Sequence, residues 1–339
     1  MQFKQLFIRT FKENLNTNTW TTAPVDTSWY QQSLHFNLYY QPPYIWSAII
    51  DYLGKRAIPG VETVQDHHYA RTVLLRPPFS HKTVKGWLRV KENLESNALM
   101  VEMSASLVPE WREVVQRLRH LFDLDVNPEI ITTALNEQWV TRGLRVPGAF
   151  NGFELGVRAI LGQQITVKAA TTLSGRLVRA LGTPFDTGIE GLDTFFPIPE
   201  VFVQLMRGET PIADILGPIG ITGRRSNTIA ALAEALVEGQ IHLNPLVKGV
   251  GADLSSASHL AQMQAAETEM RRLLAIKGIG NWTAQYIGMR ALGYTDSFLE
   301  TDIGIKNAMP NYDTPKARLT ASETWRPLRS YAVVNLWNM

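Results

Sequence analysis

The stretch Ile276–Tyr286 reads IKGIGNWTAQY. Two glycines separated by Ile279 predict a tight turn, because glycine permits a positive φ and lets another chain approach the backbone closely. Trp282 and Tyr286 follow the turn and are four residues apart, which puts both on one face of a helix. The stretch therefore predicts a helix, a short turn and a second helix that presents two aromatic side chains.

Such a hairpin is suited to a phosphate group, since free backbone N–H groups and the helix dipole favour an anion at a helix start. A corner between two helices that binds nothing also uses glycine. Two aromatic residues on a helix are, taken alone, more often part of the core than of a site. The stretch by itself leaves both interpretations open.

The composition limits the chemistry of the rest of the chain. The 339 residues are 45% apolar and 19% charged with a net charge of +2, as in globular proteins with two or three subdomains. No apolar run approaches the ~18 residues of a membrane span. The absence of cysteine excludes disulfides, a thiol nucleophile and a conventional iron–sulfur cluster. We expect no cofactor, no membrane association and a cytoplasmic location.

The pattern along the chain predicts an α+β fold. Residues 1–36 form a polar extension of unknown structure. Residues 37–127 alternate as strands with two amphipathic helices, one of them from Pro109, which predicts a small antiparallel-sheet N-terminal domain. After Pro128 the chain is mostly helical.

We expect two helical subdomains in this body, with the helix-hairpin-helix motif near residues 268–293. One comprises residues 128–147 and 295–339 and closes the active-site cleft; the other comprises residues 148–294. A helical break is expected at Gly162, and further helices are expected to begin at Pro199, Gly223, Ser255 and Asn281.

A carboxylate follows the hairpin in the segment FLETDIGIKNAM, Phe298–Met309. Asp302 stands at an expected helix start, where aspartate commonly caps the free N–H groups of its own helix. The combination of a Gly-x-Gly hairpin, an aromatic helix face and this aspartate resembles the helix-hairpin-helix DNA glycosylase superfamily.

Longer segments sharpen the resemblance to the AlkA-type branch, the 3-methyladenine DNA glycosylases II. They extend from about Tyr40 to Trp337, and those that carry it are FELGVRAILGQQITVKAA (153–170), LLAIKGIGNWTAQYIGMRALGYTDSFLETDIGIK (273–306), WRPLRSYAVVNLW (325–337), YQPPYIWSAIIDYLGKRAIPGVETVQDHHYAR (40–71) and LFDLDVNPEII (121–131).

The resemblance assigns Asp302 as the catalytic carboxylate. Cleavage of an N-glycosidic bond builds positive charge on the sugar, which an ionised carboxylate stabilises, and the same group can activate the attacking water. Trp282 stands where strand-cleaving relatives have a lysine nucleophile, and an indole forms no Schiff base. The resemblance thus implies a monofunctional enzyme without lyase activity.

The resemblance also implies the base pocket and the DNA contacts. The expected pocket residues are Trp282, Tyr286, Trp325, Tyr52 and Ile303, the last standing where the prototype has an aromatic residue. The expected DNA contacts are Gly278, Gly280, Asn281, Thr283, Gln163, Gln164 and Arg224, with Gln164 in place of the prototype's leucine wedge. The carbonyls of Leu274, Ile276 and Ile279 are expected to hold a monovalent cation when DNA is bound.

The sequence thus predicts a monomeric enzyme that acts on double-stranded DNA and removes flipped alkylated bases of the 3-methyladenine and 7-methylguanine type. A glycosylase of the same fold for deaminated or oxidised bases stays open. So does a non-catalytic helix-hairpin-helix DNA-binding protein, although phosphate binding gains nothing from Asp302.

Overall fold

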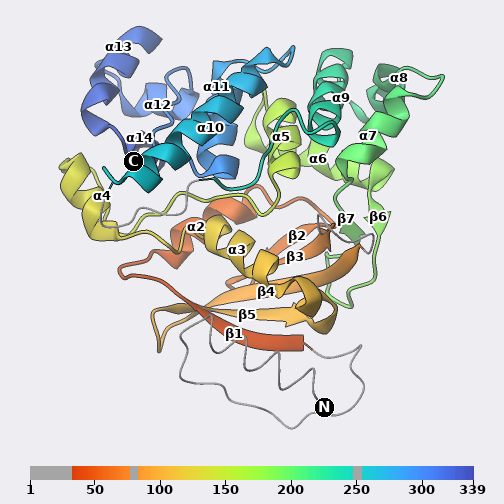
Figure 1. Ribbon diagram of the computed structural model, residues 1–339, viewed down its shortest axis with the longest axis horizontal. Helices are drawn as coiled ribbons and strands as arrows, with labels where there is room; N and C mark the ends of the chain where they lie inside the picture. Colours follow the sequence, from red (N-terminus) through yellow and green to blue (C-terminus); the bar gives the residue numbers. More distant parts are fainter. Residues whose placement is uncertain (1–32, 77–82, 247–253) are drawn as a thin grey trace.

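The computed structural model describes residues 33–76, 83–246 and 254–339. Most of the expected N-terminal extension lies outside these residues, and the first strand begins at Ser33. Figure 1 shows two layers, with a β-sheet on one side, a helical body on the other, and helices α2 (Trp46–Gly54) and α3 (Trp111–Leu121) between them. The predicted α+β class is confirmed.

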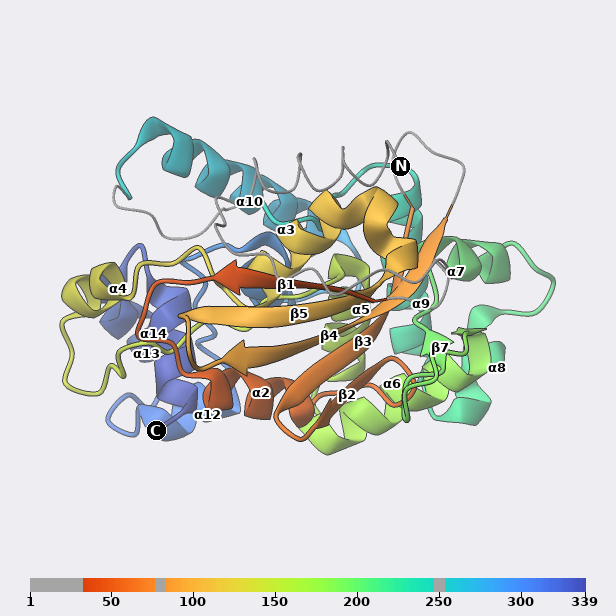
Figure 2. The same cartoon turned by 90° about the horizontal axis from the view of Figure 1, so that it is seen from below.

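The N-terminal domain is built on one antiparallel sheet. Its five strands lie in the order β1-β5-β4-β3-β2 (Figure 2). They are β1 (Ser33–Tyr39), β2 (Glu62–Gln65), β3 (His68–Leu75), β4 (Val84–Asn93) and β5 (Ala98–Ser104). Alternate residues such as Leu88 and Val90 on β4 are buried, because successive strand residues point to opposite faces. The helix predicted from Pro109 begins at Trp111, and Pro109 lies in a preceding 3-10 helix, Ala105–Glu110.

The body is a set of short helices. They are α4 (Pro128–Leu135), α5 (Gly152–Leu161), α6 (Val167–Leu181), α7 (Pro199–Met206), α8 (Ile212–Leu216), α9 (Gly223–Val237), α10 (Ala257–Ala275), α11 (Asn281–Ile287), α12 (Ile303–Ala308), α13 (Pro315–Ala321) and α14 (Arg329–Trp337). A π-helical turn, Gly288–Leu292, continues α11. The predicted starts at Pro199, Gly223 and Asn281 are confirmed, as is the break at Gly162, whereas the helix expected from Ser255 begins at Ala257.

Buried ion pairs fix the sheet domain to the body. Arg71 on β3 donates to Glu154 on α5 at 2.7 Å, and Arg158 on α5 donates to Glu62 on β2 at 2.9 Å. A buried charge without a partner is strongly destabilising, so these pairs favour a single orientation of the sheet domain on the body. In that orientation α2, which carries Tyr52, lies against the body. Within the described ranges, no helix is both long and apolar enough to span a bilayer.

Candidate active site

The two glycines of the hairpin between α10 and α11 meet different requirements. Gly278 has a φ of +99°, and a Cβ added there would lie 2.0 Å from Oγ1 of Thr228 on α9. The Thr228 hydroxyl donates to the carbonyl of Lys277 at 3.1 Å, which holds α9 against the turn. Gly280 has a φ of −96°, and a Cβ added there would have no atom within 4 Å. Gly278 thus shapes the turn, while Gly280 leaves space in front of it.

The segment between α5 and α6 is attached to this hairpin by Gln163. Its side-chain amide donates to the carbonyl of Gly278 at 3.0 Å and to the hydroxyl of Thr283 at 3.1 Å. Thr283 is buried. The neighbouring Gln164 is exposed and has a φ of +59°, a conformation that is uncommon for residues other than glycine. One glutamine therefore fixes the hairpin, and the other projects from the surface.

Two further expected DNA contacts lie at the same surface. Arg224 is exposed in the first turn of α9. Asn281 is exposed at the start of α11, where its amide donates to Glu300 at 2.9 Å. The carbonyl of Ile276, expected to bind a cation, accepts a hydrogen bond from the N–H of Ile279 at 3.0 Å. The cation site stays a prediction.

Asp302 lies at the centre of a set of N–H donors. As the N-cap of α12 it accepts from the backbone N–H of Gly304 at 2.9 Å and of Ile305 at 3.3 Å, both at Oδ1. The indole of Trp337 donates to the same oxygen at 3.0 Å, and the indole of Trp282 donates to Oδ2 at 3.1 Å. All four partners are donors, which suits an ionised carboxylate, since that group only accepts.

Four aromatic side chains gather around this carboxylate, and we call Tyr52, Trp282, Tyr286 and Trp337 the aromatic cluster. Trp282 and Tyr286 are stacked at 5.0 Å between ring centroids, and Tyr52 and Trp337 at 6.1 Å. The hydroxyls of Tyr52 and Tyr286 are 3.1 Å apart. The cluster joins α2 of the sheet domain to α11 and α14 of the body.

A buried arginine lies behind the aromatic cluster. Arg290 donates to the hydroxyl of Tyr286 at 2.7 Å and to the carbonyls of Pro147 and Gly148 at 2.7 and 2.9 Å. Burial by itself raises the pKa of Tyr286, but the positive charges of Arg290 and Arg56 outweigh it and lower that pKa to about 8. For Tyr52 burial dominates and raises the pKa to about 12.

Comparison with known proteins decides the family. Residues 157–331 match the HhH-GPD superfamily base excision DNA repair proteins, and residues 35–151 match the AlkA N-terminal domain. The chain belongs to the HhH-GPD superfamily. The predicted family, the fold and the function of a base-excision DNA glycosylase are confirmed at this level.

Individual relatives of this HhH-GPD protein cover most of its length. DNA-3-methyladenine glycosylase 2 of Escherichia coli is 33% identical over 89% of this chain and 96% of the relative. A probable bifunctional transcriptional activator/DNA repair enzyme AlkA of Mycobacterium tuberculosis is 32% identical over 87% of this chain but only 55% of that longer protein. The 3-methyladenine DNA-glycosylase structure from Archaeoglobus fulgidus has a TM-score of 0.66 at 19% identity, covering 89% and 97% of the two chains, which shows a shared fold.

The HhH-GPD sequence motifs pointed to some of the residues around Asp302 and missed others. Trp282, Tyr286 and Tyr52 lie together as the resemblance implied, but Trp337 and Arg290 were not predicted. Trp325 lies elsewhere: its indole donates to Glu137 at 3.2 Å, and its ring packs on Trp139 at 5.3 Å. Ile303 follows Asp302 directly and is 67% exposed, and its place in the base pocket stays a prediction.

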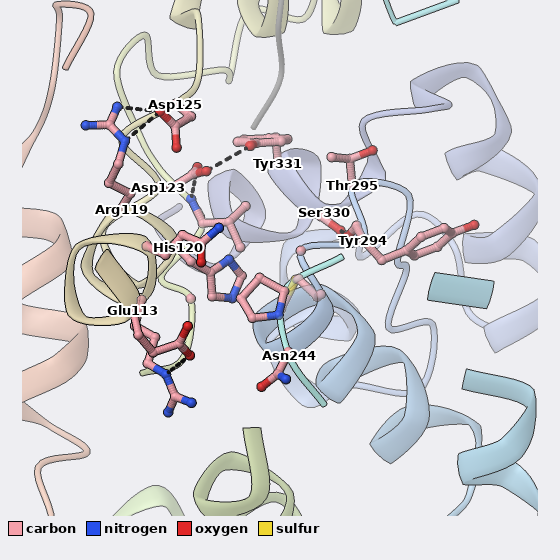
Figure 3. A pocket seen from close by; sticks show the side chains of 17 residues that line it. Glu113, Arg119, His120, Asp123, Asp125, Asn244, Tyr294, Thr295, Ser330 and Tyr331 are labelled. Carbon is pink, nitrogen blue, oxygen red and sulfur yellow. Dashed lines mark hydrogen bonds and ion pairs between the residues drawn. The ribbon is translucent and has the colours of Figure 1, made fainter. Parts of the chain in front are cut away.

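A separate cavity of about 250 Å³ lies where α3 of the sheet domain meets the HhH-GPD body (Figure 3). Its lining includes His120, Asp123, Asn244, Thr295 and Tyr331 and contains none of the residues around Asp302. His120 donates from Nε2 to the carbonyl of Arg290 at 2.8 Å when that nitrogen carries the proton. Burial lowers the pKa of His120 to about 4 and raises that of Asp123 to about 6. This cavity is not the base pocket.

The two hairpin glycines give a matched pair of substitutions. We expect Gly278→Ala to lower the free energy of unfolding by about 1–3 kcal/mol, because a side chain is strained at positive φ and collides with Thr228. Gly280→Ala should leave thermal unfolding unchanged and weaken the binding of a fluorescent duplex. Equal melting temperatures for Gly278→Ala and the wild type would contradict the assigned role of Gly278.

Proposed function

We propose that this protein is a monofunctional DNA glycosylase that hydrolyses the N-glycosidic bond of alkylated bases, of the 3-methyladenine and 7-methylguanine type, after they flip out of duplex DNA. It leaves an abasic site and acts as a monomer, since one flipped base requires one active site. The observation that carries the proposal is Asp302, held by four N–H donors inside the aromatic cluster.

The geometry of Asp302 supports a hydrolytic mechanism. As the bond to the base breaks, positive charge develops on the sugar, and a carboxylate already fixed in place stabilises it without reorganising. A carboxylate whose partners are all donors also suits a water molecule that must lose a proton as it attacks. Asp302 therefore acts as the catalytic residue by stabilising charge and orienting water.

The aromatic cluster supports the choice of base. An alkylated purine that carries positive charge stacks on Trp282 and gains about 0.5–2 kcal/mol of cation–π attraction from that ring. Two of the relatives and structural neighbours, from E. coli and A. fulgidus, are named for 3-methyladenine. Flipping a damaged base out of the duplex costs less than flipping a normal one, so the lesion itself contributes to selectivity.

The same geometry supports a monofunctional reaction. Strand cleavage by this class of enzyme requires an amine that forms a Schiff base with the sugar. Trp282 fills the position next to Asp302, and the hydrogen bonds that Asp302 receives in the described part of the chain come from indole and backbone N–H groups, not from lysine. DNA reaches the site across Gly280, Gln164 and Arg224.

The proposal is tested with duplexes that carry one methylated, deaminated or oxidised base. Free base and strand breaks are measured before and after alkali, with borohydride present in a parallel sample. We expect release of methylated bases, breaks only after alkali, and no covalent adduct. Preferential release of the deaminated or oxidised base would overturn the substrate class, and borohydride trapping would overturn the monofunctional assignment.

A further inference from the structure

We propose that Trp337 is a positioning residue that, with the start of α12, occupies Oδ1 of Asp302 and leaves Oδ2 as the oxygen that faces the reacting sugar. This inference rests on the proposed function, in which Asp302 is the catalytic carboxylate. It assigns separate tasks to the two oxygens of one side chain.

The hydrogen bonds of Asp302 are divided unequally. Oδ1 accepts three N–H groups, from Gly304 at 2.9 Å, Ile305 at 3.3 Å and Trp337 at 3.0 Å. A carboxylate oxygen offers about two lone-pair sites, so Oδ1 has no further capacity. Among residues 33–76, 83–246 and 254–339, Oδ2 accepts only from Trp282, at 3.1 Å, and it therefore retains a lone pair for the sugar or the attacking water.

The contact between Trp337 and Asp302 depends on a glycine. A Cβ added at Gly304 would lie 2.8 Å from Cδ1 and 3.1 Å from Nε1 of Trp337, and 3.0 Å from Oδ1 of Asp302. The φ of Gly304 is not in the left-handed region, so the backbone itself does not require glycine there. The missing side chain is what lets the indole reach the carboxylate.

Trp337 is itself held from the opposite side. It is the last residue of α14, and its ring stacks on Tyr52 of α2 at 6.1 Å with 17° between the planes. Because Tyr52 also lies 3.1 Å from the hydroxyl of Tyr286, the sheet domain determines where the indole N–H points. The orientation of the Asp302 carboxylate is thus fixed from both domains.

Trp337→Phe tests the assignment, because phenylalanine keeps a ring against Tyr52 and removes only the N–H donor. We expect single-turnover base release to slow about tenfold to a hundredfold, as for the loss of one hydrogen bond to a charged group. Affinity for abasic-site DNA should change less than about twofold. The loss should fall on the maximal single-turnover rate and not on the enzyme concentration at half-saturation.

Gly304→Ala is the second variant: it keeps Trp337, but the added Cβ crowds both the indole and Oδ1 of Asp302. Alanine is favoured over glycine in a helix, so slower release at an equal or higher melting temperature is not a folding defect. Trp46→Phe is the matched control: it removes an indole N–H that donates to the carbonyl of His67 at 3.2 Å, and its single-turnover rate should match that of the wild type.

An NMR comparison of the ¹³C-labelled aspartate carboxyls, with the Asp302 signal assigned by Asp302→Asn, needs no activity. We expect the Asp302 carboxyl signal to move in Trp337→Phe and in Gly304→Ala, because both change the hydrogen bonds at Oδ1, and to stay in place in the control variant. An Asp302 signal that stays in place in Trp337→Phe would overturn the role of Trp337, whereas a wild type that releases no base would overturn the proposed function alone.

Discussion

Asp302→Asn is expected to reduce the release of methylated bases by at least about a hundredfold at neutral pH. The amide is neutral and cannot stabilise positive charge on the sugar as a fixed carboxylate does. It also has only one acceptor oxygen, so it cannot accept from the three Oδ1 donors and also from the indole of Trp282 at the other position. Single-turnover release of free base from a methylated duplex measures the loss.

This substitution separates catalysis from folding. Asparagine caps a helix about as well as aspartate, so the melting temperature should change little and the variant should still bind abasic-site DNA. Glu300→Gln is the control, because Glu300 lies in the same loop and its side chain accepts from the exposed Asn281 at 2.9 Å, while its backbone carbonyl, which accepts from Arg318, is unchanged. An Asp302→Asn protein with more than about a tenth of the wild-type rate would remove Asp302 from the catalytic role.

The parts of the site that were predicted correctly are those marked by sequence patterns only a few residues long. The hairpin glycines, the N-cap position of Asp302 and the aromatic face of α11 all follow from spacing within a few residues. The break at Gly162 and the strands β3, β4 and β5 are read from periodicity in the same way. The two-residue strands β6 (Thr183–Pro184) and β7 (Thr194–Phe195) are too short to show any period.

The missed residues depend on tertiary packing. Trp325 and Trp337 belong to one short segment, and no local pattern says which indole turns toward Asp302; the path of α14 and the missing side chain of Gly304 decide it. Arginine is usually exposed, so the sequence gives no reason to expect Arg290 in the core. In the structure it is buried and donates to the carbonyls of Pro147 and Gly148, which are distant in sequence. Partners so remote in sequence are found only in the folded chain.

Arg290→Met is expected to lower the free energy of unfolding by about 3–5 kcal/mol. The substitution leaves the carbonyls of Pro147 and Gly148 and the hydroxyl of Tyr286 without their buried, charge-assisted donor. It also removes a cation that lies 4.9 Å from the ring of Tyr52. Arg142→Met is the control, since Arg142 forms an exposed pair with Glu129, and such pairs contribute little. Chemical denaturation of both variants measures the difference.

A pH titration shows whether Arg290 acts through its charge. In the wild type we expect one tyrosine to ionise at a pKa of about 8, because Arg290 and Arg56 outweigh the effect of burial on Tyr286. Since an unfolded tyrosine has a pKa near 10, the unfolded state binds more protons between about pH 8 and 10. The contribution of Tyr286 to stability therefore rises across that window and is lost as the pH falls through 8.

Without the guanidinium, burial dominates and the pKa of Tyr286 should rise above its ordinary value. The tyrosinate absorbance near pH 8 should then disappear in Arg290→Met, as it should in Tyr286→Phe. The pKa of Tyr52 is shifted in the opposite direction, to about 12. Its contribution to stability is therefore lost as the pH rises from 10 through 12. A tyrosine that still ionises near pH 8 in Arg290→Met would show that the charge of Arg290 does not control the hydroxyl at the base of the aromatic cluster.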